Sequence, residues 1–492
     1  MSWTPKLKRT ESILDYFPGV PRPVQREALL QLEANWDKAD VFLVGLAVGA
    51  GKSRVAYTIA QWAWSKHRQR SCITTPTRIL TEQYASEFPK LHCLKAQSQY
   101  ECLIEDRDPD APPRTCKDVK QSLGRMCDAQ ECCYLKAMKA TFKRPQVLAN
   151  YYTYMSSKLY RDVVVFDEAH QTLELVRSSL ATRLWKHDYE FPSWVRTYAT
   201  LHKWVTTHPM LEQRPKLKLL AAELEGLKRK FLIVREMQPY RGEERECLSL
   251  KPLDISNAKP ILWPEAKVRK LVFLSATMNW QDLKELGLQK RRTHVIDLPS
   301  PIPAERRPVV LESVGNMSFK YQEETLPKIA AYIQECLETR KGKGIIHAPY
   351  AVAAKLQGLL SHPRLMSHDR DNKTEMYQAF RAAEGEAVFL ASGLYEGIDL
   401  AGSDYQWQLV TKVPYPSLAE PVISYRAETD SDWYLWESLK VVLQACGRIC
   451  RGADDYGETL LLDSSFGRLI EQARGRGMLP QWWLDSYSIR RR

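Results

Sequence analysis

A glycine-rich loop that follows a short apolar run constrains the fold more than any other part of the sequence. Residues 40–44 are mostly apolar, and Gly49-Ala50-Gly51-Lys52-Ser53 comes soon after them. Residues 54–66 then carry apolar side chains at helical spacing. A strand, a tight loop and a helix in this order predict a parallel α/β sheet whose strands carry ligands at their carboxyl ends.

The residue types in the loop suit a nucleotide phosphate. Gly49 and Gly51 let the backbone turn tightly and aim its N–H groups at phosphate oxygens. We expect Lys52 to neutralise the β and γ phosphates of ATP and the Ser53 hydroxyl to ligate Mg²⁺. The strict loop pattern has glycine where this chain has Leu46, so the loop is a subtype. The alternative is an ordinary glycine turn.

An acidic pair follows a second apolar run. Asp167 and Glu168 come directly after residues 162–166. ATP hydrolysis needs one carboxylate to hold Mg²⁺ through its water shell, which we assign to Asp167. It needs a second acid to orient and deprotonate the attacking water, which we assign to Glu168. A solvated acidic loop is the alternative, and the glycine loop upstream disfavours it.

Two arginines near the C-terminus are candidates for stabilising γ-phosphate charge. Arg448 and Arg451 are three residues apart, so on a helix they would share one face. Across a cleft from Lys52 they would act as arginine fingers. Gln444 and Gly447 stand at matching offsets and favour this role over that of two surface arginines.

The strand pattern divides the chain into two α/β domains with two insertions. Further strands are expected at residues 71–75, 270–274, 344–347, 387–390 and 459–463. The insertion at residues 172–260 has a mostly helical pattern, and that at 94–145 is rich in cysteine. The predicted domains are residues 1–93, 146–171 and 261–304 for the first α/β domain, 94–145 for a metal domain, 172–260 for a helical arch and 305–492 for the second α/β domain.

Five of the eleven cysteines fall between residues 102 and 133. Cys102, Cys116, Cys127 and Cys132 have the spacing C-x13-C-x10-C-x4-C, and Cys133 is an alternative to Cys132. Four thiolates bind either structural zinc or an iron–sulfur cluster, and the spacing alone leaves both open. Zinc ribbons and fingers prefer two close pairs, which this spacing lacks.

Charge and hydropathy limit the partners. The chain has 71 basic and 59 acidic residues, a net charge of +12 that suits a polyanion as well as a merely soluble basic protein. Apolar residues make up 44% of the chain, enough for real cores. No apolar run is long enough for a membrane span, and no signal peptide is visible at the N-terminus.

These segments together resemble a superfamily 2 helicase of the XPD/DinG-like iron–sulfur branch, and the compact length suggests a phage-type member. The resemblance covers most of the chain. The matching segments are Arg22-Pro23-Val24-Gln25 for adenine reading, Thr75-Pro76-Thr77-Arg78 for motif Ia, Asp167-Glu168-Ala169-His170 for the DEAH box, Ser275-Ala276-Thr277 for motif III, Tyr395-Glu396-Gly397-Ile398-Asp399 for motif V and residues 444–451 for motif VI.

The resemblance implies roles for single residues. Gln25, Gly397 and Asp399 would join the ATP and Mg²⁺ site. The cysteines would hold a 4Fe–4S cluster. Thr75, Thr77 and Arg78 would contact the nucleic-acid backbone, and Tyr100 and Tyr134 would stack on bases, although packing is the alternative for these two rings. Three departures stand out: Cys133 replaces a proline, Val48 replaces Thr or Ser, and the helical insertion is shorter than the family's arch.

The expected protein is an ATP-dependent DNA helicase with two RecA-like domains, an iron–sulfur insertion and a small helical arch. It would act as a monomer on single-stranded DNA and on junctions with duplex, moving 5′→3′. It would work in the cytoplasm of a bacterial or phage-infected cell, or in a eukaryotic nucleus. The alternatives are a translocase that remodels without processive unwinding and a non-enzymatic DNA-binding protein with a vestigial ATP site.

Overall fold

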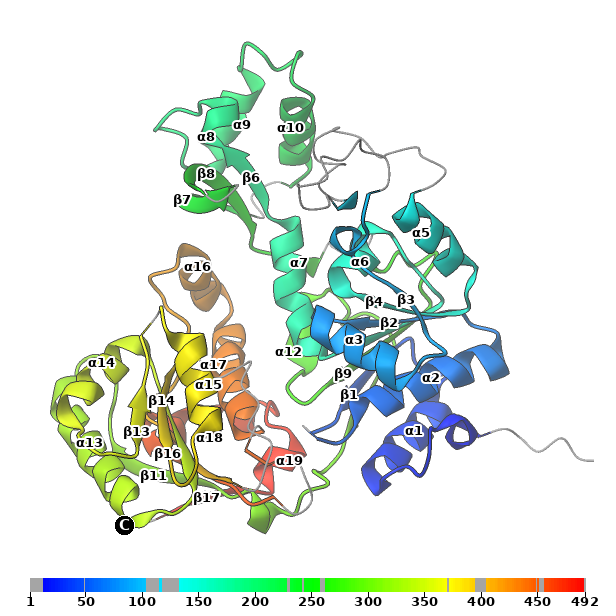
Figure 1. The fold of residues 1–492 in the computed structure, drawn as a ribbon. Coiled ribbons are helices and arrows are strands. Elements are labelled where there is room, and N and C mark those ends of the chain that lie inside the picture. The colour runs from blue at the N-terminus through cyan, green and yellow to red at the C-terminus, as the bar shows by residue number, and fades with distance from the viewer. Residues whose placement is uncertain are drawn as a thin grey trace, which may run out of the picture.

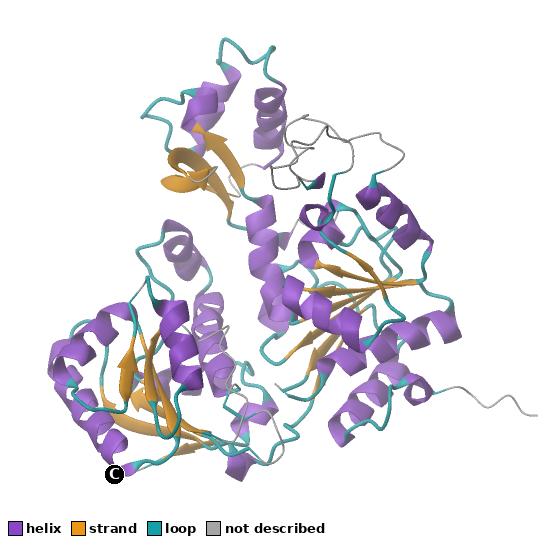
Figure 2. Cartoon of the chain, in the orientation of Figure 1, coloured by secondary structure: helices purple, strands orange, loops and turns teal. Residues whose placement is uncertain are grey.

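Two lobes, each built on a seven-stranded parallel sheet, make up most of the computed structural model (Figure 1). Helices cover both faces of each sheet (Figure 2). The predicted pair of parallel α/β domains is therefore confirmed. The structure describes residues 12–47, 49–102, 115–116, 132–227, 231–240, 243–256, 262–369, 371–393, 404–447, 449–450 and 455–490.

The first sheet has the strand order β10-β1-β9-β5-β2-β4-β3. Its strands are β1 (Val41–Gly45), β2 (Ser71–Thr75), β3 (His92–Leu94), β4 (Gln146–Asn150), β5 (Val163–Asp167), β9 (Lys270–Ser275) and β10 (Thr293–Asp297). All its strand pairs are parallel, and β9 lies between β1 and β5. The carboxyl ends of β1, β5 and β9 therefore meet at one edge, where the glycine loop, the acidic pair and Ser275 follow them.

The strands of this sheet are apolar on both faces because helices bury both. One face packs against α1 (Pro23–Asn35), α2 (Lys52–His67) and α3 (Arg78–Glu87). The other packs against α6 (Tyr151–Ser156), α7 (Thr172–Leu180) and α12 (Trp280–Glu285), with α5 (Cys133–Lys143) beside them.

The second sheet has the order β13-β14-β12-β15-β16-β11-β17. Its strands are β11 (Val309–Gly315), β12 (Lys343–Ala348), β13 (Leu365–Ser367), β14 (Val388–Ser392), β15 (Tyr405–Val410), β16 (Glu458–Asp463) and β17 (Tyr487–Ile489). Its helices are α13 (Gln322–Thr339), α14 (Tyr350–Leu359), α15 (Lys373–Ala382), α16 (Pro421–Thr429), α17 (Ser431–Cys446), α18 (Ser465–Gly475) and α19 (Gln481–Leu484).

The insertion that follows α7 is not mainly helical, which corrects the expectation of a helical arch. Its elements are β6 (Thr182–Trp185), α8 (Lys186–Tyr189), α9 (Tyr198–Thr206), α10 (Pro215–Leu227), β7 (Phe231–Tyr240) and β8 (Glu243–Pro252). The three strands form an antiparallel sheet. Leu248 and Leu250 alternate along β8 and pack in a core with Leu201 of α9 and Leu220 of α10. This period of two is a strand signal that outweighed helix propensity.

Buried ion pairs join the two lobes. Asp282 of α12 lies 3.1 Å from Lys440 of α17 and accepts a hydrogen bond from Trp436 at 2.8 Å. Glu285 of α12 pairs at 2.8 Å with Arg426 of α16, and Arg177 of α7 also contacts its carboxylate. The insertion reaches the second lobe as well, since β7 contacts α16 (Figure 1). Within the described ranges, no helix has the length and apolarity needed to cross a membrane.

A glycine in the middle of the second sheet provides a test of this packing. Gly344 of β12 is paired with Trp407 of β15, and a Cβ at Gly344 would lie 2.3 Å from the buried indole. We expect Gly344→Ala to lower the free energy of unfolding by about 1–3 kcal/mol, because the strand and the ring must shift. Thermal unfolding followed by circular dichroism measures this change.

Gly358→Ala is the matched control, because a Cβ there meets no atom within 4 Å and the site is an exposed turn of α14. Alanine should leave stability unchanged or raise it by about 0.5–1 kcal/mol, since it has the higher helix propensity. Equal effects of the two substitutions would contradict the packing around Trp407.

Candidate ATP site and nucleic-acid interface

The glycine loop has the backbone shape that its sequence predicts. Gly49 and Gly51 have φ angles of +78° and +77°, in the left-handed region that glycine adopts without strain. Gly51 directly precedes α2, so Lys52 and Ser53 form the first turn of that helix. The N–H groups at a helix start attract anions, which suits a phosphate at this loop.

Lys52 and Glu168 form an ion pair across the sheet edge. Lys52 Nζ lies 3.1 Å from Glu168 Oε1, with Lys52 buried and Glu168 partly exposed. Glu168 has a φ angle of +49°, which is uncommon for a residue with a side chain and is found at constrained functional positions. The group predicted to bind phosphate therefore touches the predicted general base.

Asp167 is buried at the end of β5, and its polar atoms all have partners. Oδ2 accepts a hydrogen bond from the Tyr84 hydroxyl at 2.6 Å, and Oδ1 accepts one from the Glu168 N–H at 3.0 Å. The Tyr151 hydroxyl donates to the Asp167 carbonyl at 2.5 Å. Burial, aided by the charge of Glu168, raises the pKa of Asp167 to about 6, although Lys52 and Tyr84 oppose the shift. A divalent cation beside this carboxylate would favour its charged form, so the site fits Mg²⁺.

Gln25 lies against the glycine loop. Its Nε2 donates to the carbonyls of Ala50 and Gly51 at 2.8 and 3.2 Å, and its Oε1 accepts from the Arg22 N–H. The Arg22 guanidinium donates to the Gly49 carbonyl at 2.6 Å. The start of α1 thus holds the glycine loop in place.

His170 connects the acidic pair to Ser275-Ala276-Thr277. Its Nδ1 lies 3.1 Å from Ser275 Oγ and 3.6 Å from a Glu168 oxygen. The Ala276 carbonyl accepts a hydrogen bond from Trp482 of the second lobe at 3.1 Å. Ala47, just before the glycine loop, also packs in a core cluster of the second lobe. The glycine loop, the acidic pair and Ser275-Ala276-Thr277 therefore lie together at the junction of the lobes.

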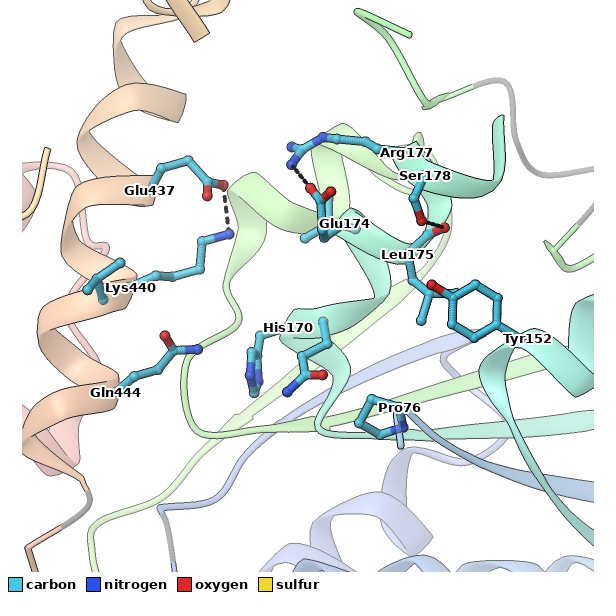
Figure 3. Close-up of a pocket in the computed structure, with 13 residues that line it drawn as sticks. Pro76, Tyr152, His170, Glu174, Leu175, Arg177, Ser178, Glu437, Lys440 and Gln444 are labelled. Atoms are coloured by element: carbon cyan, nitrogen blue, oxygen red, sulfur yellow. Dashed lines mark hydrogen bonds and ion pairs between the residues drawn. The ribbon is translucent and has the colours of Figure 1, made fainter. Parts of the chain in front are cut away.

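A cavity of about 480 Å³ lies between the lobes beside this site. Figure 3 shows its two walls: Glu437, Lys440 and Gln444 on α17 face His170 and Glu174 on the other side. On α17, Lys440 pairs with Glu437 at 2.7 Å. Gln444 is the labelled α17 side chain that lies beside His170 in Figure 3.

The other predicted residues of the second lobe are not all covered by the structure. Arg448, Arg451, Gly397 and Asp399 lie outside the described residues. The expectation that a helix carries both arginines is wrong, because α17 ends at Cys446 and residues 449–450 are not helical. Gly447, which has low helix propensity, follows the last helical residue. The role of the two arginines as fingers stays a prediction.

Three of the predicted cysteine ligands are described, and two of them touch. Cys116 Sγ lies 3.8 Å from Cys132 Sγ. Cys132 is buried, whereas Cys133 is partly exposed as the first residue of α5, so the structure brings Cys132 to Cys116. Cys127 lies outside the described residues. In the part of the chain that the structure describes, no three His, Cys, Asp or Glu side chains are grouped closely enough to hold a metal ion.

The predicted nucleic-acid contacts divide by exposure. Thr77 caps α3 by accepting a hydrogen bond from the Leu80 N–H, and Arg78 is exposed beside it. Thr75 is buried and hydrogen-bonds to Thr81, so it braces this loop from inside. Tyr134 is also buried.

The burial of Thr75 and Tyr134 corrects two expectations. The Tyr134 ring packs edge-on against the Tyr100 ring, with centroids 5.5 Å apart. Neither Thr75 nor Tyr134 is accessible to a strand, so we withdraw both from the predicted nucleic-acid contacts. Tyr100 is partly exposed and stays among them.

Sequence reasoning missed three side chains at this site. Tyr84 bonds to Asp167, Glu87 of the same helix lies beside the glycine loop, and Tyr152 is exposed and lines the cavity with Pro76. Tyr84 belongs to no local motif, because its partner is distant in the chain.

Comparison with known proteins gives two family matches that lie one in each lobe. Residues 19–187 match the model of the type III restriction enzyme res subunit, and residues 334–486 match the helicase C-terminal domain. A regulator of telomere elongation helicase 1 homolog from Anopheles gambiae is 27% identical over 167 residues, 30% of this chain. The ATP-dependent DNA helicase YoaA of Escherichia coli (strain K12) is 24% identical over 250 residues, 47% of this chain. The matched segments cover 16% and 38% of these relatives' own lengths.

Solved structures agree on the fold. A structure titled XPD_Helicase matches with a TM-score of 0.60 at 14% identity, and one of S. tokodaii Xpd4 with a TM-score of 0.57 at 14% identity. Each match covers 96% of this chain and 100% of the other. One family model matches in each lobe, and the fold match spans nearly the whole chain. The chain is therefore similar to DNA helicases in sequence over part of its length, and to the XPD structures in fold over nearly all of it.

Proposed function

We propose that this protein is an ATP-dependent DNA helicase that moves 5′→3′ along single-stranded DNA. The observation that carries the proposal is the connected set of Lys52, Asp167, Glu168 and His170 at the junction of the lobes. These groups meet the requirements of ATP hydrolysis, and Gln444 faces them from the other lobe (Figure 3). The direction of movement rests on the family resemblance.

The Lys52–Glu168 pair has a direct role in this mechanism. Without nucleotide, Lys52 and Glu168 neutralise each other at 3.1 Å. A γ-phosphate takes over Lys52 and releases Glu168, which then orients the attacking water and accepts its proton. Asp167 and the Ser53 hydroxyl would hold Mg²⁺, which supplies charge neutralisation at the phosphates. ATP binding thus frees Glu168 to act as the general base in ATP hydrolysis.

The proposed path for the strand follows exposed and basic groups near the lobe junction. Thr77 and Arg78 lie at the start of α3, and Tyr152 lines the adjoining cavity with Pro76. A helix start favours phosphate, and an exposed tyrosine ring favours base stacking. The net charge of +12 supports the same partner. Single-stranded DNA and its junctions with duplex are therefore the proposed substrates.

A 4Fe–4S cluster on Cys102, Cys116, Cys127 and Cys132 is the cofactor that the family resemblance supports. The described pair also fits zinc, because two thiolates of one tetrahedral zinc ion with Zn–S bonds of about 2.3 Å lie about 3.8 Å apart. The measured Cys116–Cys132 separation is 3.8 Å. We propose the cluster, and metal analysis separates the two.

The first prediction tests the ATP site. Lys52→Ala removes the ammonium that meets the phosphates, so DNA-stimulated ATP hydrolysis should fall by at least about 100-fold, the scale for losing one electrostatic stabiliser. Unwinding of a duplex with a 5′ overhang should be lost, while binding to oligo-dT stays. Phosphate release, strand displacement and fluorescence anisotropy measure the three activities.

Lys66→Ala is the matched control, because Lys66 lies on the same helix but pairs with Glu33 away from the loop. It should behave as wild type. Near-normal turnover of Lys52→Ala would place the hydrolytic site elsewhere. DNA-stimulated hydrolysis in the wild type without strand displacement would favour the translocase alternative, and the absence of hydrolysis would favour a vestigial site.

A second prediction concerns the strand contact. Arg78→Ala should weaken oligo-dT binding and reduce the slope of log K against log salt by about one, because one phosphate contact is lost. Anisotropy titrations over a range of KCl concentrations measure the slope. Arg269→Ala is the control: it removes an exposed arginine next to the amino end of β9, at the opposite edge of the sheet. Equal slopes for Arg78→Ala and wild type would exclude Arg78 from the path.

A third prediction concerns the cysteines. Anaerobically purified protein should be yellow-brown and contain about four irons per chain. Cys116→Ser should bleach it, since a serine oxygen is a harder and less acidic ligand. Cys133→Ser should keep the colour, because Cys132 is the thiol that lies against Cys116. One zinc and no iron would overturn the cluster and leave the helicase proposal standing.

A further inference from the structure

Helix α3 connects the proposed strand contact to the ATP site. Its first turn presents Thr77 and Arg78 at the surface. Its inner face carries Thr81 and Tyr84, both buried. The hydroxyls of Thr75 and Thr81 lie 2.6 Å apart, which ties the exposed loop to the body of the helix. A helix of this length moves as one piece, so a change at its first turn reaches the whole inner face.

Tyr84 reaches Asp167 from this helix. Its side chain is 1% exposed, and its hydroxyl donates to Asp167 Oδ2 at 2.6 Å. The ring packs against Phe88, which stacks on Tyr57 of α2 with centroids 4.4 Å apart and planes 11° apart. Packing therefore fixes the ring, and the hydroxyl has a set direction toward the carboxylate. A hydrogen bond to a charged, buried acceptor is among the stronger ones in proteins.

The last residue of α3 lies beside the glycine loop. Glu87 accepts a hydrogen bond from Arg54 Nε at 3.1 Å and lies 3.5 Å from the Ser53 hydroxyl. Ser53 can donate its proton to Glu87 while its oxygen lone pairs remain available to a metal. One helix thus touches both residues that are expected to hold Mg²⁺.

We propose that Tyr84 and Glu87 are positioning residues: through them α3 holds Asp167 and Ser53, and single-stranded DNA bound at the first turn of α3 tightens metal binding at the ATP site. The proposal rests on the proposed function, because it deepens how DNA regulates that site. Tyr84 carries most of the effect, since its contact is buried and the Glu87 contact is exposed. By linkage, the metal must tighten DNA binding by the same factor when the nucleotide concentration is held constant.

The experiment measures metal binding at equilibrium, without turnover. Mn²⁺ is titrated into the full chain with ADP, with and without oligo-dT, and free Mn²⁺ is followed by its EPR signal. In the wild type with ADP present throughout, oligo-dT should tighten Mn²⁺ binding about fivefold or more, and Mn²⁺ should tighten oligo-dT binding equally. Tyr84→Phe should weaken Mn²⁺ binding about tenfold, on the scale of a lost hydrogen bond to a carboxylate, and reduce both coupling factors toward one.

Matched variants separate positioning from general loss of stability. Tyr154→Phe removes a buried hydroxyl that donates to the Leu262 carbonyl, so it costs a comparable hydrogen bond away from the metal ligands. It should keep wild-type Mn²⁺ affinity and coupling. Glu87→Gln should weaken Mn²⁺ binding by a smaller factor than Tyr84→Phe. Glu82→Gln changes the same helix at an exposed residue near Gln99 and should have no effect.

Three outcomes overturn the proposal. They are equal Mn²⁺ affinities for Tyr84→Phe and wild type, a wild type whose Mn²⁺ affinity is unchanged by oligo-dT, and a Tyr154→Phe variant that loses coupling as strongly as Tyr84→Phe. A wild type that couples Mn²⁺ and DNA binding but hydrolyses no ATP would refute the proposed function instead.

Discussion

The ion pair between Lys52 and Glu168 is the interaction on which the site depends. It joins the start of α2 to the end of β5, at the edge of the sheet that the glycine loop and the acidic pair share. Asp167 beside it is buried, and burial raises its pKa. A carboxylate in such a place needs positive charge nearby to remain ionised, and Lys52 supplies it until a metal arrives. Tyr84 holds Asp167 by a hydrogen bond, and His170 lies beside Glu168. These contacts keep the charged groups of the site close together.

The sequence predicted the elements that carry strong local signals. The apolar strands before the glycine loop, before Asp167 and before Ser275 were all placed correctly, because buried parallel strands are continuous apolar runs. Parallel strands end at the same edge of a sheet, and the motif residues meet there because β1, β9 and β5 are neighbours. The edge could be predicted from the sequence, whereas the neighbouring of the three strands came from the structure.

The remaining features depend on distant contacts. The β7–β8 pair was missed because its alternation of apolar and polar residues lies between segments with a helical pattern. The end of α17 at Cys446 depends on packing at the lobe junction, as well as on Gly447. Thr75 and Tyr134 match family motifs, yet burial against neighbouring elements decided that they brace the structure. Tyr84 was missed because no short segment contains both it and Asp167.

The buried charges between the lobes have a consequence for how the lobes move. Asp282–Lys440 and Glu285–Arg426 lie at one place, where α12 meets α17 and α16. Removing one partner from a buried pair typically costs about 3–5 kcal/mol, so a motion that pulled these groups apart would be expensive. A rotation of one lobe about this point keeps the pairs intact and changes the separation elsewhere. The charge cluster thus restricts relative movement of the lobes to rotations that keep α12 against α16 and α17.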